Sequence, residues 1–345
     1  MTTSVTKFRN DFKQGVLDFA WHEWCRAGVP GSSKPGNTWI VDPEVLLAFT
    51  TEAGRHDARL FDEVLGWLAV NGDWINTGRL SAVMKHDGTG DRAVAGAMAA
   101  WMCERDSSLK WRGIARRSLG EAYSPEESLF QTVPAGTIPG RGQADKCFKA
   151  YGLLRGKVRI STRAQHINLN EAANIVFRTR ALFGIGIRAD VIAHLLCTQS
   201  GHARGIAEAL GYNHMRVGEV LAGLAKGGFI SVRAVGRAKS YRLDRKRWSS
   251  LTRIQGTSAV QWVNWRALVR GLTAIWRAGE TIDGKRADDY IVSSKMRSAM
   301  RKARDDLRAS GIEFDIHDDE SYIAEAYLPV FLDDCAGIVG TLLSV

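Results

Sequence analysis

The fold of the central part of this chain is decided by residues 188–248, which read RADVIAHLLCTQSGHARGIAEALGYNHMRVGEVLAGLAKGGFISVRAVGRAKSYRLDRKRW. Apolar residues recur there at helical spacing, and glycines and an asparagine interrupt them. The pattern predicts, in order, a helix over 190–197, a short helix over 202–210, a turn at 211–213, a longer helix over 214–226, and strands over 229–234 and 240–243. A basic tip at 235–239 joins the two strands, so the segment ends in a β-hairpin.

Positive charge is concentrated in this part of the chain. The protein has 345 residues and a formal net charge of +10. Between residues 201 and 250 there are 10 Lys or Arg residues and 3 Asp or Glu residues, a net charge of +7. From residue 256 onward there are 11 cations and 14 anions. An excess of cations on one segment favours an anionic partner, of which nucleic acid is the commonest.

The order helix, helix, turn, helix and hairpin is that of a winged helix-turn-helix. In such a domain the second helix of the pair reads base edges in the major groove of double-stranded DNA. The helix over 214–226 has that position, and its apolar residues are expected to face the domain core: Met215, Val217, Val220, Leu221 and Leu224. The candidate DNA-contacting residues near its start are Asn213, which is also its candidate N-cap, His214 and Arg216. Arg204, in the preceding helix, is a further candidate.

The hairpin supplies the other candidate contacts. Its cations are Arg233, Arg237, Lys239 and Arg242, and no anion lies between residues 233 and 243. Binding to DNA needs cations that replace the counterions condensed on the phosphates. The hairpin is therefore expected to lie along the sugar-phosphate backbone or in the minor groove.

A resemblance to bacterial winged helix-turn-helix transcriptional regulators of the ArsR/MarR type rests on two patterns within residues 188–248. HARGIAEALGYNHMRVGEVLAGLAKGGFI is similar to their helix-turn-helix pattern, and Gly236, Arg237, Tyr241 and Leu243 match the residues that close their hairpin. The resemblance implies a DNA-binding regulator of transcription. Metal-sensing members use clustered Cys or His ligands, and no such cluster occurs in this sequence, so metal sensing is not implied.

The fold class expected for the whole chain is mainly α, with the winged helix-turn-helix as one of several parts. We expect an N-terminal helical domain over 1–120, a linker with a connecting helix over 121–180, the winged domain over 181–250 and a C-terminal helical domain over 256–345. The N-terminal helices over 42–104 could form a second, degenerate helix-turn-helix, but their weakly basic surface favours a helical scaffold. The helix over 260–278 carries an aromatic face and is the candidate dimerisation element.

The flanking helices are predicted from apolar periodicity and capping residues. They cover residues 7–27, 43–52 with Asp42 as N-cap, 58–70, 77–84, 92–104, 170–183, 260–278 and 287–310. A short strand is expected over 311–316. The apolar stretch 322–343 is expected to be broken at Pro329.

Neither a cofactor nor a metal site is expected. The five cysteines and eight histidines are scattered, and the sequence His317-Asp318-Asp319 is a weak metal candidate because adjacent residues rarely converge. Scattered cysteines without a CxxC pair indicate reduced thiols. The chain starts with polar residues and has no run of about 18 apolar residues, so a signal peptide and a membrane span are not expected. The predicted location is the cytoplasm.

The function that these patterns predict is sequence-specific binding of double-stranded DNA by a transcriptional regulator, expected to be a homodimer and not an enzyme. Two alternatives stay open. The chain could be an antitoxin-like or defence-locus protein that binds a protein partner and autoregulates its operon. It could also be an enzyme delivered to DNA by the winged domain, although no acid–base, nucleophile or phosphate-binding constellation is present.

Overall fold

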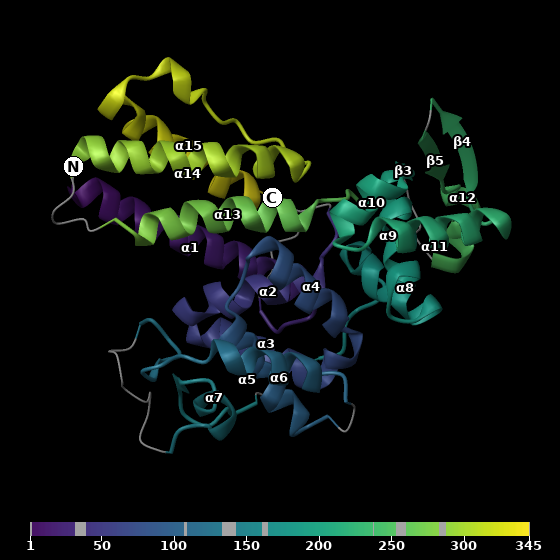
Figure 1. Ribbon diagram of the computed structural model, residues 1–345, viewed down its shortest axis with the longest axis horizontal. Helices are drawn as coiled ribbons and strands as arrows, with labels where there is room; N and C mark the ends of the chain where they lie inside the picture. Colours follow the sequence, from purple (N-terminus) through teal and green to yellow (C-terminus); the bar gives the residue numbers. More distant parts are fainter. Residues whose placement is uncertain are drawn as a thin grey trace. The chain divides into compact units, whose positions relative to one another are not determined.

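The computed structural model describes residues 2–31, 39–106, 109–132, 143–160, 165–236, 238–252, 260–282 and 288–344. Over these residues the protein is mainly α-helical, as predicted, and carries two small sheets (Figure 1). It forms two compact units. Of the described residues, unit 1 contains those up to His22 and from Val263 onward, and unit 2 those from Glu23 to Trp262.

Unit 1 is a set of long helices. They are α1 (Thr2–Arg26), of which only the part up to His22 belongs to this unit, α13 (Trp265–Glu280), α14 (Asp289–Ala309) and α15 (Tyr327–Leu343). Figure 1 shows α13 and α14 side by side. The ring of Phe19 stacks on Trp265 with 5.6 Å between centroids, and Lys13 pairs with Glu280 at 2.7 Å. Residues from both ends of the sequence therefore build one core.

The first part of unit 2 is helical. Its elements are α2 (Pro43–Ala53), α3 (Ala58–Asn71), α4 (Thr77–Asp87), α5 (Arg92–Cys103), α6 (Arg112–Ser118), α7 (Lys146–Lys149) and a parallel pair of short strands, β1 (Glu127–Ser128) and β2 (Leu153–Leu154). A polar residue caps the start of each of the first four helices with its side chain: Asp42, Asp57, Asn76 and Asp91. Trp24 and Trp67 meet edge to face at its centre, with ring centroids 5.0 Å apart.

The rest of unit 2 runs from α8 to α12, and we call this part the central segment. The elements of the central segment are α8 (Ile175–Phe183), α9 (Ile187–Thr198), β3 (Ser200–His202), α10 (Ala203–Leu210), α11 (His214–Lys226), β4 (Ser231–Val235), β5 (Ala238–Arg242) and α12 (Arg245–Thr252). The three strands form an antiparallel sheet in the order β3-β5-β4. The three helices and the hairpin predicted here are present, whereas β3 was not predicted.

Several boundaries differ from those predicted. Pro329 does not break the last helix, because it is the third residue of α15 and its missing N–H lies in the first turn, where no intrahelical partner exists. Residues 311–316 form no strand. The helix expected over 260–278 begins only at Trp265, after the cap Asn264, because Gln261 is held in an extended bridge to Trp39.

The N-terminal helices resemble a scaffold rather than a second DNA reader. A recognition helix must present an exposed face to the groove. In α5 the side chains from Ala93 to Ala99 are all buried, as are Trp101 and Met102. The helix is therefore enclosed by its neighbours, and a second helix-turn-helix over 42–104 would have no reading face on it.

Within the described chain, the segment Ala324–Leu343 is long and apolar enough to cross a membrane by length and composition, although no such span was expected. Core helices of soluble proteins pass the same test. In α15 the buried positions recur every three or four residues, as at Tyr327, Phe331, Cys335 and Ile338. This periodicity is that of a helix with one face against a core.

Five charged side chains from the helical scaffold and from the central segment meet inside unit 2. They are Asp42, Glu44, Arg79, Arg180 and Asp190, and none is more than 4% exposed. The Glu44 carboxylate accepts hydrogen bonds from Arg79 Nη1 at 2.6 Å and from Arg180 Nη1 at 2.7 Å. Arg180 Nε also donates to Asp190 at 2.9 Å, and Arg79 Nη1 to Asp42 at 2.6 Å. The five groups thus form a continuous ionic network.

The network extends to the turn before α11. Arg79 Nε donates to the carbonyl oxygen of Leu210 at 2.8 Å. The Tyr212 hydroxyl donates to Asp190 Oδ2 at 2.6 Å and accepts from Asn76 Nδ2 at 3.0 Å. The end of α10 and the turn that follows are therefore fastened to α4, a helix more than 100 residues away in sequence.

Electrostatics keeps the network ionised. Burial raises the pKa of Glu44, but the Arg180 and Arg79 guanidiniums and their hydrogen bonds outweigh it and bring the pKa to about 2. Burial lowers the pKa of Arg180, but the carboxylates of Asp190 and Glu44 outweigh it, so that its pKa is raised. Removing Arg79 would leave Asp42 buried without its cation, and removing Arg180 would do the same to Asp190.

Replacing Arg180 is expected to destabilise the protein strongly. Arg180→Met removes the cation shared by Glu44 and Asp190, so we expect a loss of about 3–5 kcal/mol in the free energy of unfolding. Urea denaturation followed by circular dichroism measures it. Arg204→Met, which changes an exposed arginine, is the control and should cost no more than about 0.5 kcal/mol. Equal effects of the two substitutions would show that the network adds no stability.

Acid is expected to destabilise the fold in two ranges. Burial beside Trp262 lowers the pKa of His194 from 6.5 to about 4, and that of Glu44 is lowered from 4.5 to about 2. Both groups bind protons more weakly in the folded chain, so stability is lost as pH falls, first below 6.5 and then below 4.5. Between pH 7 and 4.5, His194 accounts for about 2 kcal/mol. Urea midpoints measured across this range should fall less steeply for His194→Gln, and an unchanged slope would contradict the assignment.

Candidate nucleic-acid interface

The helix pair α10 and α11 is fixed by a small apolar core and by its turn. Ile206, Leu210, Val217 and Leu221 are buried at the contact of the two helices with α9. Gly211 has a φ of 75°, a left-handed conformation that glycine adopts without strain. The chain can therefore turn directly from α10 into α11.

The start of α11 is the exposed part of this pair. Asn213, His214, Met215 and Arg216 are consecutive and exposed, and Met215 is 65% exposed. The prediction that Met215 faces the core is wrong, because the buried residues of α11 are Val217, Leu221 and Leu224 and they place Met215 on the outer face. An apolar side chain therefore stands among the polar candidate contacts, where it could meet a thymine methyl group.

Asn213 serves as the helix cap. Its Oδ1 accepts hydrogen bonds from the backbone N–H groups of Met215 at 2.9 Å and of Arg216 at 3.4 Å. These are two of the donors that the first turn of a helix leaves unsatisfied. The side-chain oxygen is thus occupied, and only the amide NH₂ can donate to an acceptor outside the protein.

The strand register divides the hairpin cations between two faces. Arg233 lies opposite Ser240, and Arg242 opposite Ser231, so Arg233 and Arg242 share one face of the sheet. Lys239 lies opposite Ala234 on the other face, the one on which Tyr241 is buried. All three side chains are exposed. Arg237, predicted at the tip, lies outside the described residues.

The third strand, which the sequence did not reveal, brings His202 to the hairpin. His202 pairs with Ser240, so it shares the sheet face of Arg233 and Arg242, and its Nδ1 lies 3.0 Å from the carbonyl oxygen of Lys239. The histidine is exposed and immediately precedes α10, on which Arg204 is exposed as well. His202 reaches this position only because β3 pairs with β5, which brings together residues 37 positions apart in sequence.

One cation of the central segment, Arg245, is used in bonds within the protein and is not free to bind an external anion. Arg245 Nε donates to the carbonyl oxygen of Leu196 at 2.6 Å, and its guanidinium also reaches Cys197, so it closes the end of α9. Trp248 Nε1 donates to the carbonyl oxygen of Phe229 at 3.0 Å and ties α12 to the start of the hairpin. These contacts hold the hairpin against the helices.

The exposed cations of the central segment lack the carboxylate partners that the buried arginines of unit 2 have. Buried arginines there have carboxylate partners, as Arg55 has Asp91 at 2.9 Å and Arg155 has Asp62 at 2.7 Å. In the described part of the chain no carboxylate lies within ion-pair distance of five exposed cations of the central segment: Arg204, Arg216, Arg233, Lys239 and Arg242. Their charge is not neutralised by the protein, so it is available to an external anion.

The side chains of His317 and Asp319, which the sequence analysis named as a weak metal candidate, bond to other residues. His317 Nδ1 lies 2.6 Å from Asp334 Oδ1, while Asp319 pairs with Arg304 at 2.9 Å. Among the residues with described positions, no group of three or more His, Cys, Asp or Glu side chains could hold a metal ion. Comparison of the chain with protein-family models, curated proteins and solved structures found no match.

The capping role of Asn213 predicts how two substitutions change the free energy of unfolding. Asn213→Ala removes the cap and should cost about 1 kcal/mol of unfolding free energy, whereas Asn213→Ser keeps a capping oxygen and should cost a few tenths. Urea denaturation distinguishes the two. If the alanine and serine variants are equally stable, the cap does not hold the start of α11.

Proposed function

We propose that this protein is a sequence-specific double-stranded DNA-binding regulator of transcription, and that α9 to β5 act as its winged helix-turn-helix. The observation that carries the proposal is the group of exposed cations without carboxylate partners that α10, the start of α11 and the hairpin carry in the described part of the chain. The order of elements, with α10 and α11 joined by a tight turn and followed by a hairpin, supports it. The fold provides the rigid frame, and the unneutralised charge provides the affinity.

In the proposed complex the N-terminal turn of α11 enters the major groove. Arg216 donates two hydrogen bonds to a guanine there, and Met215 and His214 contact neighbouring bases. Arg233, Arg242 and His202, which share one face of the β3-β5-β4 sheet, lie against the phosphates. Arg204 approaches the backbone from α10. The α11 residues would set the sequence preference, and the sheet residues the salt-dependent affinity.

We further propose that the regulator acts as a homodimer, because such domains read two half-sites about one helical turn apart. The helix first considered for dimerisation is not free for it. The apolar face of α13, including Trp265, Leu268 and Leu272, is buried within unit 1.

An exposed apolar cluster at the α8–α9 turn, with Phe183, Ile185 and the nearby Phe229, is the surface that we propose instead. Sedimentation equilibrium of the wild-type chain and of Phe229→Ser tests this.

Fluorescence anisotropy with labelled duplexes, titrated with salt, tests the proposed function. The duplexes are random sequences and the promoter region of the protein's own gene. Arg233→Ala and Arg242→Ala should weaken binding to all sequences and should each reduce the salt slope by about 1, because each removes a phosphate contact. Arg216→Ala should cost about 1–3 kcal/mol on the preferred sequence and relax specificity at one base pair.

Arg159→Ala is the matched control, because Arg159 is exposed in the same unit but outside the central segment. Its affinity and salt slope should equal those of the wild-type chain. Absence of binding at about 50 mM salt would refute the DNA-binding proposal, since electrostatic affinity is largest at low salt. Binding that all three arginine variants retain in full would refute the placement of α11 and the hairpin.

A further inference from the structure

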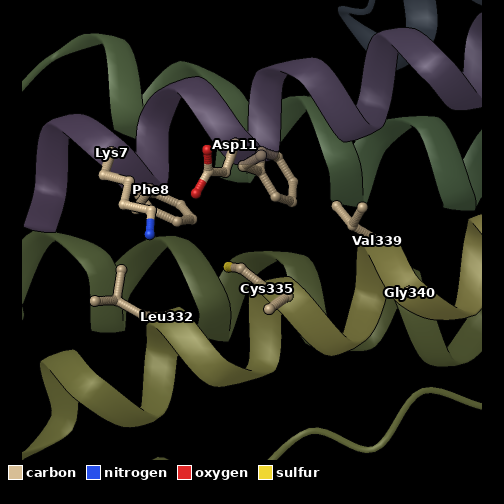
Figure 2. A pocket seen from close by; sticks show the side chains of 9 residues that line it. Lys7, Phe8, Asp11, Leu332, Cys335, Val339 and Gly340 are labelled. Atoms are coloured by element: carbon tan, nitrogen blue, oxygen red, sulfur yellow. The ribbon is translucent and has the colours of Figure 1, made fainter.

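Unit 1 contains a cavity between the N-terminal half of α1 and α15. Its volume is about 390 Å³, within the range of small-molecule sites in proteins. Its lining residues are Lys7, Phe8, Asp11 and Phe12 of α1 and Leu332, Cys335, Ala336, Val339 and Gly340 of α15. Figure 2 shows the side chains of Lys7 and Phe8 on α1 and of Leu332, Cys335 and Val339 on α15 in the space between the two helices. Most of the wall is therefore apolar, and the two charged residues stand on one helix.

The packing of the two helices explains why a space remains. At one end α1 and α15 are in close contact, because a Cβ placed on Gly15 would lie only 2.3 Å from Val339 Cγ1. At the other end the rings of Phe8 and Phe331 meet edge to face with centroids 5.2 Å apart. Between these contacts α15 presents the small residue Ala336, and Gly340 follows Val339 directly; neither is large enough to fill the gap.

Two side chains of opposite charge, Lys7 and Asp11, line the cavity one helical turn apart. Lys7 and Asp11 are four residues apart in α1, so their side chains lie one turn apart on the same face. Neither side chain has an ion-pair partner among the described residues, and they do not pair with each other. Figure 2 shows the Lys7 ammonium directed toward α15. An anion and a cation could thus be bound side by side above an apolar chamber.

The floor of the chamber is neutral. Cys335 is 1% exposed, and burial raises the pKa of its thiol well above the usual range, so the thiol stays protonated. Phe8 and Phe12 are 8% and 4% exposed and form the wall on the α1 side. An apolar ligand group would replace water on the accessible apolar part of the lining, at Leu332, Ala336 and Val339, at no cost in buried charge.

We propose that this cavity binds a small zwitterion with an apolar tail, of the chemical class of the apolar α-amino acids. The carboxylate of the ligand pairs with Lys7, its ammonium pairs with Asp11, and its side chain lies against Leu332, Ala336 and Val339 of α15, above the buried Cys335. A fatty acid could pair its carboxylate with Lys7 but would leave Asp11 without a partner, and an alkylamine could pair with Asp11 but would leave Lys7 without one. This site is independent of the proposed DNA contact, since it lies wholly in unit 1.

Isothermal titration calorimetry of the full chain with L-leucine and L-phenylalanine tests the proposal. Saturable binding is expected for at least one of them. N-acetyl-L-leucine lacks the ammonium group and L-leucinamide lacks the carboxylate, and each should bind at least tenfold more weakly than L-leucine. Lys7→Met and Asp11→Asn should each weaken binding of the zwitterion by a similar factor.

Two glycines of α15 provide a matched pair of variants. Gly340 lines the cavity and Gly337 does not, and a Cβ on either meets no atom within 4 Å, so both variants are expected to fold. Gly340→Leu should fill the cavity and abolish binding, whereas Gly337→Leu should leave it unchanged. Thermal unfolding of both variants shows that the fold is retained.

Three results would overturn the proposal. These are no binding of either amino acid at millimolar concentration, equal binding of the blocked derivatives, and unchanged binding by Gly340→Leu. Tighter binding of octanoate than of L-leucine would assign the cavity to a fatty acid and would also overturn it. DNA affinity is read in a separate assay, so the failure of one proposal does not affect the other.

Discussion

Glu44 is a carboxylate without solvent access, and its charge is balanced by two arginines from distant parts of the chain. Arg79 comes from α4 and Arg180 from α8, and the latter is 136 residues away in sequence. Such a group has a large desolvation cost, which is offset only when both guanidiniums are in place. The helical scaffold and the helices that carry the candidate interface are thereby joined in one compact unit, and their relative placement follows from a few hydrogen bonds of defined geometry.

This constraint reaches the surface through the turn at Tyr212. The tyrosine hydroxyl bonds Asp190 of α9 and Asn76 of the scaffold, and the next residue, Asn213, caps α11. The first turn of α11 is thus held from within, while its outer side chains stay exposed. A reading helix needs both properties, because base recognition depends on side chains held to within a fraction of an ångström.

Arginine has two roles in unit 2, and burial separates them. Arg79 and Arg180 are enclosed with carboxylates and stabilise the fold. Arg216 and Arg233 are exposed, with no carboxylate within ion-pair distance among the described residues. Formal charge counts cannot distinguish these roles, since each arginine adds one cation to the sum. Only the second kind contributes to the field that an external phosphate would meet.

Local patterns were sufficient for much of the secondary structure. Asp42 followed by Pro43 marks a helix start with its own cap and a residue preset for the first turn, and α2 begins there. The helix over 214–226 has the predicted bounds, because an N-cap asparagine and a pair of glycines delimit it. The candidate residues Arg204, His214, Arg216, Arg233, Lys239 and Arg242 are all exposed. Periodicity alone misplaced Met215, since the apolar face of a helix is known only when its neighbours are.

Contacts between residues far apart in sequence could be decided only by the tertiary structure. No local signal pairs Glu44 with Arg180, places His202 beside Ser240, or brings Gly15 against Val339. The sequence by itself determined where α2 and α11 start and where positive charge gathers, because these depend on neighbours within a few turns. The tertiary structure decided which charges are neutralised, which faces stay exposed and where a cavity remains, because these depend on the packing of elements that the chain brings together from a distance.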